Sequence, residues 1–175
     1  RTLIRLQQPT DGHIYLNGTD IAGLKGAQLK EMRKEAQIIF QDPSACLNPR
    51  RTIKQILMEP FEIHNLKGKI DVDAKIMELL QLVGLEKKAD RYPGQLSGGE
   101  QQRVAIARAL TSGSELILAD EPTGNLDSEN SRNIVGILQG LAHEGNRCVI
   151  IVTHDPAVAE VADVLLKMKD GKLIH

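Results

Sequence analysis

The spacing of apolar residues predicts that strands and helices alternate along the chain. Compact apolar runs predict strands at residues 37–41, 116–120 and 148–153. Apolar positions at helical intervals predict helices at 28–34, 52–66, 71–85, from 97, at 129–143 and from 155. Val, Ile and Leu dominate the strand runs, which is typical of strands buried on both faces. We therefore expect an α/β fold in which helices cover a parallel sheet on both sides.

Turn residues delimit smaller elements near both ends of the chain. After opening helical turns at residues 1–6, the segment 9–12 predicts a turn, and 13–18 alternates like a short exposed strand at a hairpin edge. Residues 164–174 predict a second hairpin that turns at Asp170 and Gly171. Gly84 predicts the end of the 71–85 helix, which forms a helical insert with the 52–66 helix.

Composition favours an ordinary globular domain. The chain has 175 residues, of which 41% are hydrophobic, so it can bury a sizeable core without disulfides. The 22 basic and 23 acidic side chains nearly cancel and only 2% of residues are aromatic, so no nucleic-acid partner is expected. The two cysteines lack C-x-x-C spacing and are predicted to be reduced thiols. No apolar run approaches the ~20 residues that a membrane-spanning helix needs.

Polar residues follow three of the predicted strands directly. Gln41 ends the first strand, Asp120 and Glu121 end the second, and Thr153 and His154 end the third. Ligands of open parallel sheets gather at the carboxyl ends of the strands, which lie along one edge. We expect these side chains to converge there on a site for a magnesium-bound polyphosphate.

The two neighbouring carboxylates fit metal-assisted hydrolysis. Asp120 would face Mg²⁺ directly or through water, because this ion prefers oxygen ligands and keeps several waters. Glu121 would face the attacking water, orient it and accept its proton as a general base. Taken alone, an Asp-Glu-Pro segment is equally compatible with a solvated strand end.

A second candidate site lies at the start of the helix from residue 97. Ser97 and Glu100 have the spacing of a capping box, in which each side chain bonds the backbone N–H of the other residue. Capping alone does not need both Gly98 and Gly99. Two glycines also remove side-chain bulk, so a phosphate could approach the free N–H groups and the positive end of the helix dipole.

Both candidate sites resemble motifs of the ATP-binding cassette (ABC) ATPases, the motor subunits of ABC transporters. The segment 96–110, LSGGEQQRVAIARAL, resembles the signature motif of the family, and 116–127, LILADEPTGNLD, resembles its Walker B motif and D-loop. The resemblance runs from residue 9 to residue 174. It implies a P-loop NTPase-like (RecA-like) fold, with one nucleotide-binding domain whose core comprises residues 1–43 and 111–175. Residues 44–110 would form a helical subdomain that includes the signature motif.

The resemblance also implies a composite site between two ATPase subunits, with ATP and Mg²⁺ as ligands. The signature residues would bind the γ-phosphate of ATP held by the opposite subunit; they are Ser97, Gly98, Gly99, Glu100 and Gln101. Asp127 would be the D-loop aspartate that crosses the subunit interface.

The resemblance assigns two of the strand-end residues as well. His154 would be the H-loop residue that contacts the γ-phosphate, although a lone His at a strand end is more often structural. Gln41 would be the Q-loop residue, which senses the nucleotide, contributes to the Mg²⁺ site and couples to the membrane partner. The helical insert, residues 49–85, would dock a permease at the cytoplasmic face of the cell membrane.

One motif of the family does not occur in the sequence. No G-x-x-x-x-G-K-[ST] is found among the 175 residues, and the chain opens at Arg1. In the family this P-loop precedes a turn like that at residues 9–12. We therefore expect the chain to be a fragment without the P-loop and the first strands, and to bind ATP weakly by itself, because most β- and γ-phosphate contacts would be missing.

The subfamily signals point in two directions. Residues 40–50, FQDPSACLNPR, resemble the Q-loop of oligopeptide, dipeptide and nickel importer ATPases. The signature and Walker B half is closer to lipoprotein-release and macrolide-export ATPases. We expect a transporter ATPase that drives import of peptides or metal chelates, and export of lipoproteins, drugs or antimicrobial peptides is the alternative.

Other functional classes fit the sequence less well. ABC ATPases of DNA repair or translation usually carry long coiled coils, tandem cassettes or basic linkers, and none occurs in the sequence. A phospho-acceptor signalling domain using Asp120 would need an acidic cluster and a lysine that are not evident. If the chain is a fragment, the sequence is also compatible with a non-catalytic remnant that only binds.

Overall fold

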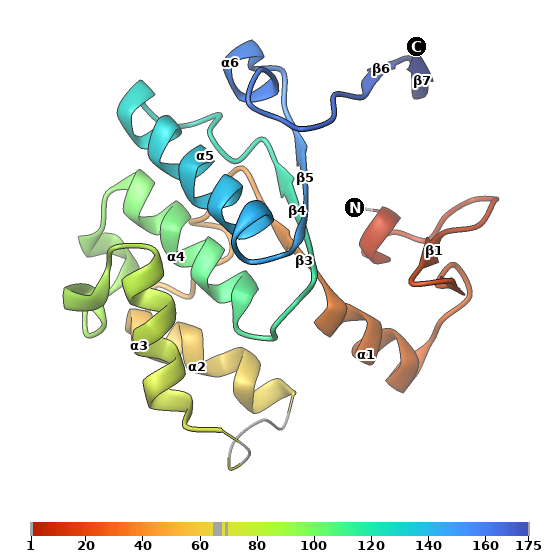
Figure 1. The fold of residues 1–175 in the computed structure, drawn as a ribbon. Coiled ribbons are helices and arrows are strands. Elements are labelled where there is room, and N and C mark those ends of the chain that lie inside the picture. The colour runs from red at the N-terminus through yellow and green to blue at the C-terminus, as the bar shows by residue number, and fades with distance from the viewer. Residues whose placement is uncertain (1, 65–67, 69, 175) are drawn as a thin grey trace.

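Three parallel strands form the centre of the computed structural model, which describes residues 2–64, 68 and 70–174 (Figure 1). They are β3 (Ala36–Ile39), β4 (Leu116–Asp120) and β5 (Cys148–Val152), hydrogen-bonded in that order. The register places Ile39 opposite Ala119, and Ala119 opposite Ile151. The predicted α/β class with a parallel sheet is confirmed.

Most of the helices lie on one side of this sheet (Figure 1). Helices α4 (Gly98–Leu110) and α5 (Ser128–His143) pack against it, and α2 (Ile53–Ile63) and α3 (Val72–Leu82) pack on α4. Helix α1 (Gly26–Glu35) leads directly into β3. The remaining elements are short: η1 (Thr2–Ile4), β1 (Tyr15–Leu16), β2 (Thr19–Asp20), η2 (Glu86–Lys88), η3 (Pro93–Gln95), α6 (Pro156–Ala159), β6 (Lys167–Lys169) and β7 (Lys172–Ile174).

Local sequence signals determine several of the element ends. Gly84 has a φ of 66° and ends α3, and the N–H of Leu85 bonds back to the carbonyl of Leu80. Asp170 and Gly171, both with positive φ, form the turn between β6 and β7 as predicted. The N-terminal hairpin turns at residues 17–18 between β1 and β2, so the strand predicted at 13–18 is shorter than expected.

Other predicted boundaries were wrong by a few residues. β3 ends at Ile39, two residues before Gln41. The opening helical turns reduce to the single 3₁₀ turn η1. Helix α2 ends at Ile63, and residues 65 and 66 of the predicted helix lie outside the described residues. No helix within the described part of the chain is both long enough and apolar enough to cross a membrane.

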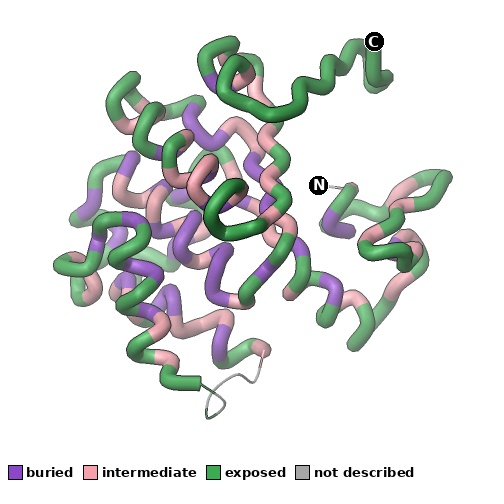
Figure 2. Tube along the Cα trace, in the orientation of Figure 1, coloured by how far each residue is buried: buried purple, intermediate pink, exposed green. Residues whose placement is uncertain are grey.

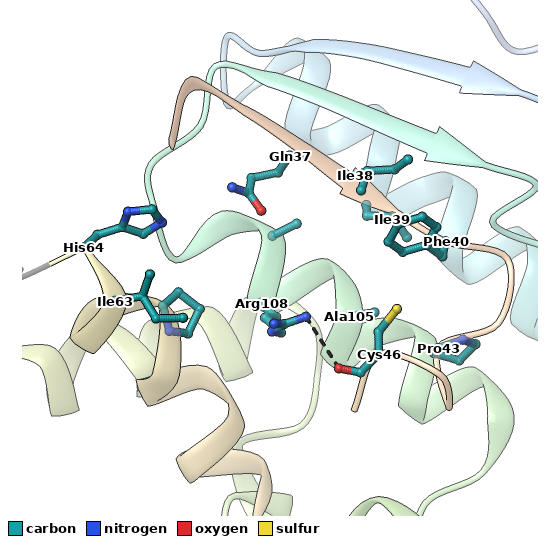
Figure 3. Close-up of a pocket in the computed structure, with 12 residues that line it drawn as sticks. Gln37, Ile38, Ile39, Phe40, Pro43, Cys46, Ile63, His64, Ala105 and Arg108 are labelled. Carbon is teal, nitrogen blue, oxygen red and sulfur yellow. Dashed lines mark hydrogen bonds between the residues drawn. The ribbon is translucent and has the colours of Figure 1, made fainter. Parts of the chain in front are cut away.

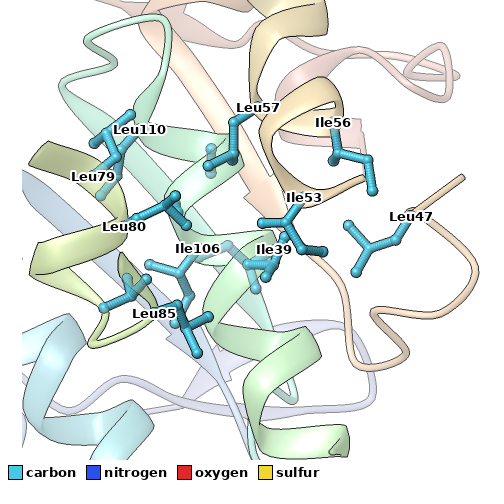
Figure 4. Packing of buried hydrophobic residues seen from close by; sticks show 14 of the residues in the cluster. Ile39, Leu47, Ile53, Ile56, Leu57, Leu79, Leu80, Leu85, Ile106 and Leu110 are labelled. Carbon is cyan, nitrogen blue, oxygen red and sulfur yellow. The ribbon is translucent and has the colours of Figure 1, made fainter. Parts of the chain in front are cut away.

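A continuous hydrophobic core joins the sheet to the four helices on its covered side (Figure 4). Ile39 of β3 meets residues of α2, α3 and α4 there, among them Leu57, Leu80 and Ile106, all at most 1% exposed. Burying each such side chain contributes roughly 1.5–3 kcal/mol relative to leaving it in water. This core holds the strand ends and the start of α4 in one rigid unit.

The prediction that helices cover both faces of the sheet was wrong over β5 (Figure 2). Val149 and Ile151 pack on the core, whereas Ile150 and Val152 on the other face are 41% and 60% exposed. A second cluster around Ile4, Ile21 and Met32 covers that other face only at β3 and β4. An apolar strand pattern shows that both faces can be buried, but it does not show how far the covering segments reach.

Candidate active site

The carboxyl ends of the three strands bring polar residues from distant parts of the sequence together. Ile39, Ala119 and Ile151 lie side by side on the three strands. Two residues further along each strand come Gln41, Glu121 and Thr153. The N–H of Glu121 still donates to the carbonyl of Val152, at 2.8 Å. The backbone therefore keeps β4 and β5 in register as they leave the sheet, and the side chains share one edge.

Glu121 is held by the end of the neighbouring strand. Its Oε1 lies 2.7 Å from Nδ1 of His154 and accepts the backbone N–H of the same residue at 3.1 Å. Its Oε2 accepts the hydroxyl of Thr153 at 3.3 Å. The Glu121 backbone has a φ of 47°, which is uncommon for a residue other than glycine and occurs often at functional sites. The carboxylate is only 20% exposed, whereas the imidazole is 83% exposed.

The contact with Glu121 also sets the ionisation of His154. Its hydrogen bond to the carboxylate, supported by the negative charge, raises the pKa of His154 above the ordinary value of 6.5. Where the Glu121 carboxylate is ionised, the protonated imidazole forms an ion pair with it, and this pair is lost as the pH rises through the raised pKa of His154. Downstream, Asp155 and Pro156 form the predicted N-cap and first residue of α6.

We expect the Glu121→Gln substitution to move the pKa of His154 back down toward 6.5, because a neutral amide stabilises the imidazolium less than a carboxylate does. NMR titration of the imidazole signals measures this shift. Glu160→Gln, a change at an exposed acid of the same loop region, provides the control and should leave the His154 pKa as it is. Equal titration of His154 in the wild type and in Glu121→Gln would contradict the ion pair.

Gln41 and Asp120 line one depression of about 350 Å³ together with Phe40, Asp42, Ala45 and Cys46. Within the described part of the chain, no cluster of three or more His, Cys, Asp or Glu side chains could hold a metal ion. A Mg²⁺ site for nucleotides needs fewer protein ligands, because one or two carboxylates combine with phosphate oxygens and waters. The carboxylate of Asp120 and the amide oxygen of Gln41 are therefore a donor set that fits Mg²⁺.

The start of α4 has the predicted capping box. Ser97 Oγ accepts the N–H of Glu100 at 3.3 Å, and Glu100 Oε2 accepts the N–H of Ser97 at 2.9 Å. The bond from the Ser97 backbone is the main cause that lowers the pKa of Glu100, and Lys88 adds to it from 3.4 Å. Gln101 was predicted to bind the nucleotide. Its side-chain amide donates to the carbonyls of Pro93 and Leu96, in the segment just before α4.

The two glycines of this helix start have different surroundings. A Cβ on Gly98 would make an ordinary 3.7 Å contact with Leu126. A Cβ on Gly99 would lie 2.5 Å from Cγ of Asn130 and closer still to its Oδ1, so a larger residue there would force Asn130 or its helix to move. Gly99 is thus required by packing within this chain, a reason that the motif alone did not reveal.

Asp127 is the N-cap of α5. Its Oδ1 accepts the N–H groups of Glu129 and Asn130 at 3.0 and 2.8 Å, and its Oδ2 accepts the side-chain amide of Asn130 at 2.7 Å. The hydrogen bonds from Asn130 lower the pKa of Asp127. Asn130 therefore links Asp127 to Gly99. Asn130 was not among the residues predicted from the sequence, although its place three positions after a capping aspartate was a usable signal.

A second cavity, of about 180 Å³, lies between β3, α2 and α4 (Figure 3). Phe40, Cys46, Ile63, His64 and Arg108 are among its lining residues. Arg108 donates to the Cys46 carbonyl at 3.5 Å, and burial lowers the pKa of His64. This cavity adjoins the segment after Gln41 and the predicted helical insert.

Known proteins resemble this chain along its whole length. A family model described as ABC transporter matches residues 1–124. The chain is 42% identical over 178 residues to the oligopeptide transport ATP-binding protein AppF of Bacillus subtilis, covering 100% of this chain and 54% of AppF. It is 43% identical over 171 residues to the macrolide export ATP-binding/permease protein MacB of Shigella flexneri, covering 97% of this chain and 26% of MacB.

The structure also has solved counterparts. The ATP-binding cassette MJ0796, determined as a dimer in a post-hydrolysis state with ADP and Pi, matches with a TM-score of 0.86 and 34% identity over 99% of this chain and 76% of MJ0796. CbiO1 of Clostridium perfringens matches with a TM-score of 0.85 and 25% identity, over 99% of this chain and 68% of CbiO1. The chain spans about half the length of the curated transport proteins that it resembles.

Proposed function

The chain belongs to the ABC transporter family, and on this premise we propose that its residues serve an ATPase that drives transport across a membrane. The observation that carries the proposal is the Glu121 carboxylate, fixed by Thr153 and His154 at the strand edge next to Asp120. A carboxylate that is mostly shielded yet adjacent to a metal-compatible acid is suited to activating water beside a phosphate.

Each residue at the edge would have a separate task in hydrolysis. Asp120 and Gln41 would hold Mg²⁺, which supplies charge neutralisation at the phosphate oxygens when it is bound with the nucleotide. Glu121 would orient the attacking water and accept its proton. The exposed imidazole of His154 would turn from Glu121 toward the γ-phosphate, whose negative charge would then favour the cationic form in place of the carboxylate.

The start of α4 would serve a second nucleotide. The first N–H groups of a helix have no partner within the helix, and they attract anions together with the helix dipole. Gly98 and Gly99 would offer such groups to ATP held by a second ATPase subunit, whereas the Ser97 N–H is already bonded to Glu100. Asp127, bonded to Asn130 beside Gly99, would cross the interface with that subunit when the two subunits come together.

We propose peptide uptake as the transported process. Residues 40–50 resemble the Q-loop of peptide importers, and several relatives are oligopeptide or dipeptide transport ATP-binding proteins. The cavity beside Phe40, Cys46 and Arg108 would receive a permease segment, which would hold the ATPase at the cytoplasmic face of the membrane. The similarity to MacB keeps macrolide export as the second candidate.

The test uses the whole reading frame that contains this chain, co-expressed with candidate peptide permease subunits and reconstituted in vesicles. We expect ATP hydrolysis that requires Mg²⁺, that stops when the metal is chelated, and that oligopeptides stimulate in the presence of the cognate binding protein. Stimulation by a macrolide instead would select the export function. Absence of Mg²⁺-dependent hydrolysis would reject the ATPase proposal itself.

A further inference from the structure

Gln102 is a polar side chain inside the apolar layer between α4 and the sheet. It is 1% exposed, and its neighbours along α4, Val104 and Ile106, are fully buried. Its Nε2 donates to the carbonyl of Phe40 at 3.1 Å, across 62 positions of the sequence. Its Oε1 has no hydrogen-bond partner among the described residues.

This arrangement is a poor source of stability. A buried amide with an unmet acceptor is less favourable than an apolar side chain of similar volume, which would fill the same space without losing hydration. The amide is therefore best explained by what its one hydrogen bond fixes, which is the carbonyl of Phe40.

Phe40 directly follows the last residue of β3 that pairs with β4. The ladder between β3 and β4 ends with Ile39 opposite Ala119, so the next residues lack the pairing that fixes a strand. The hydrogen bond from Gln102 fixes the chain one residue beyond this ladder and directly before Gln41.

The position of Gln41 matters because its side chain lies against the turn that follows Glu121. A Cβ on Gly124 would lie 2.8 Å from Nε2 of Gln41, and the N–H of Gly124 donates to the carbonyl of Glu121 at 3.1 Å. Gln41 also lines the same depression as Asp120. A shift of Phe40 would move the Gln41 amide relative to both carboxylates.

We propose that Gln102 is a positioning residue for hydrolysis, which holds Gln41 at the strand edge through the Phe40 carbonyl. This role rests on the proposed ATPase function. Gln102 does not touch the reacting groups; it connects α4, which starts at Gly98 after the N-cap Ser97, to the amide at the metal-compatible depression.

The test is a double-mutant cycle in the full-length transporter. Gln102→Met keeps the side-chain length and removes the hydrogen bond. We expect kcat for ATP to fall about 10- to 100-fold, since small misplacements at an active site have effects of that size, while KM and the melting temperature stay close to those of the wild type. In a Gln41→Ala background, Gln102→Met should cause no further fall, because both changes remove the same positioning.

Two further variants separate positioning from a structural effect. Gln139→Met removes another bond from a Gln amide to a backbone carbonyl, 3.2 Å from Val161, and should leave kcat unchanged. Gln102→Glu can donate to Phe40 only when it is protonated. Its kcat relative to the wild type should therefore rise as the pH falls, which Gln102→Met should not show.

Each outcome decides the question. A kcat of Gln102→Met within twofold of the wild type, or an equal further loss in the Gln41→Ala background, overturns the positioning role. If Gln102→Met unfolds, the pH dependence of Gln102→Glu decides in its place, and a flat ratio to the wild type rejects the proposal. Hydrolysis that persists in Glu121→Gln would instead reject the proposed ATPase site, so the two failures are distinguishable.

Discussion

Glu121→Gln should lower kcat for ATP hydrolysis by roughly 10²- to 10⁴-fold, the range expected when a general base is removed. The amide keeps the shape of the carboxylate and can still accept a hydrogen bond from Thr153, but it cannot accept the proton of the attacking water. ATP binding and ATP-dependent dimerisation should persist, because they use phosphate and metal contacts rather than proton transfer. Single-turnover hydrolysis together with analytical ultracentrifugation measures both properties.

Glu160→Gln is the matched control for this prediction. It makes the same chemical change at an exposed position after α6, and we expect hydrolysis at the wild-type rate. Hydrolysis by Glu121→Gln at a comparable rate would remove Glu121 from the role of base. The 2.7 Å contact with His154 would then have only a structural purpose.

The ends of β4 and β5 were predictable to within one residue because their signals are local, whereas β3 ends two residues earlier than predicted. A buried apolar run followed at once by Asp120 and Glu121, or by Thr153 and His154, indicates both the strand and the polar residues at its carboxyl end. The capping residues Ser97 and Asp155 likewise have signatures within four residues. The roles of these residues in binding and hydrolysis stay predictions, since they depend on ligands and on a second subunit.

The missed features all depend on contacts between distant segments. Gln102 reaches Phe40 across 62 positions, and its place in a helical apolar pattern gives no sign of a tertiary hydrogen bond. The packing of Asn130 on Gly99 depends on how α4 and α5 meet. The open face of β5 depends on how far the N-terminal cluster extends, which the composition of the strand does not encode.

Gly99→Ala should lower the free energy of unfolding by about 1–3 kcal/mol, the usual cost of overpacking, which amounts to several degrees of melting temperature in a protein of this size. The added methyl would overlap the Asn130 side chain, whose amide is already fixed by Asp127. To relieve the overlap, Asn130 must leave Asp127 or α5 must shift from α4. Thermal unfolding followed by circular dichroism measures the loss.

Gly98→Ala separates packing from phosphate binding. Its methyl would make only an ordinary contact with Leu126, so the melting temperature should stay within about 1–2 °C of the wild type, as for a change below ~0.5 kcal/mol. If Gly98 leaves room for a phosphate at the start of α4, this variant should still lose ATP-dependent dimerisation, measured in the Glu121→Gln background. Wild-type dimerisation would leave packing at Gly99 as the sole reason for glycine in this motif.

The stability loss in Gly99→Ala should depend on Asn130. In an Asn130→Ala background the obstructing amide is absent, so adding Gly99→Ala should cost little beyond the loss caused by Asn130→Ala itself. Additive losses would mean that Gly99 is required for its backbone freedom rather than for the space under Asn130. The negative φ of a helical residue argues against that, because alanine adopts it without strain. Non-additivity would therefore establish Asn130 as the residue that joins the signature helix to the Asp127 cap.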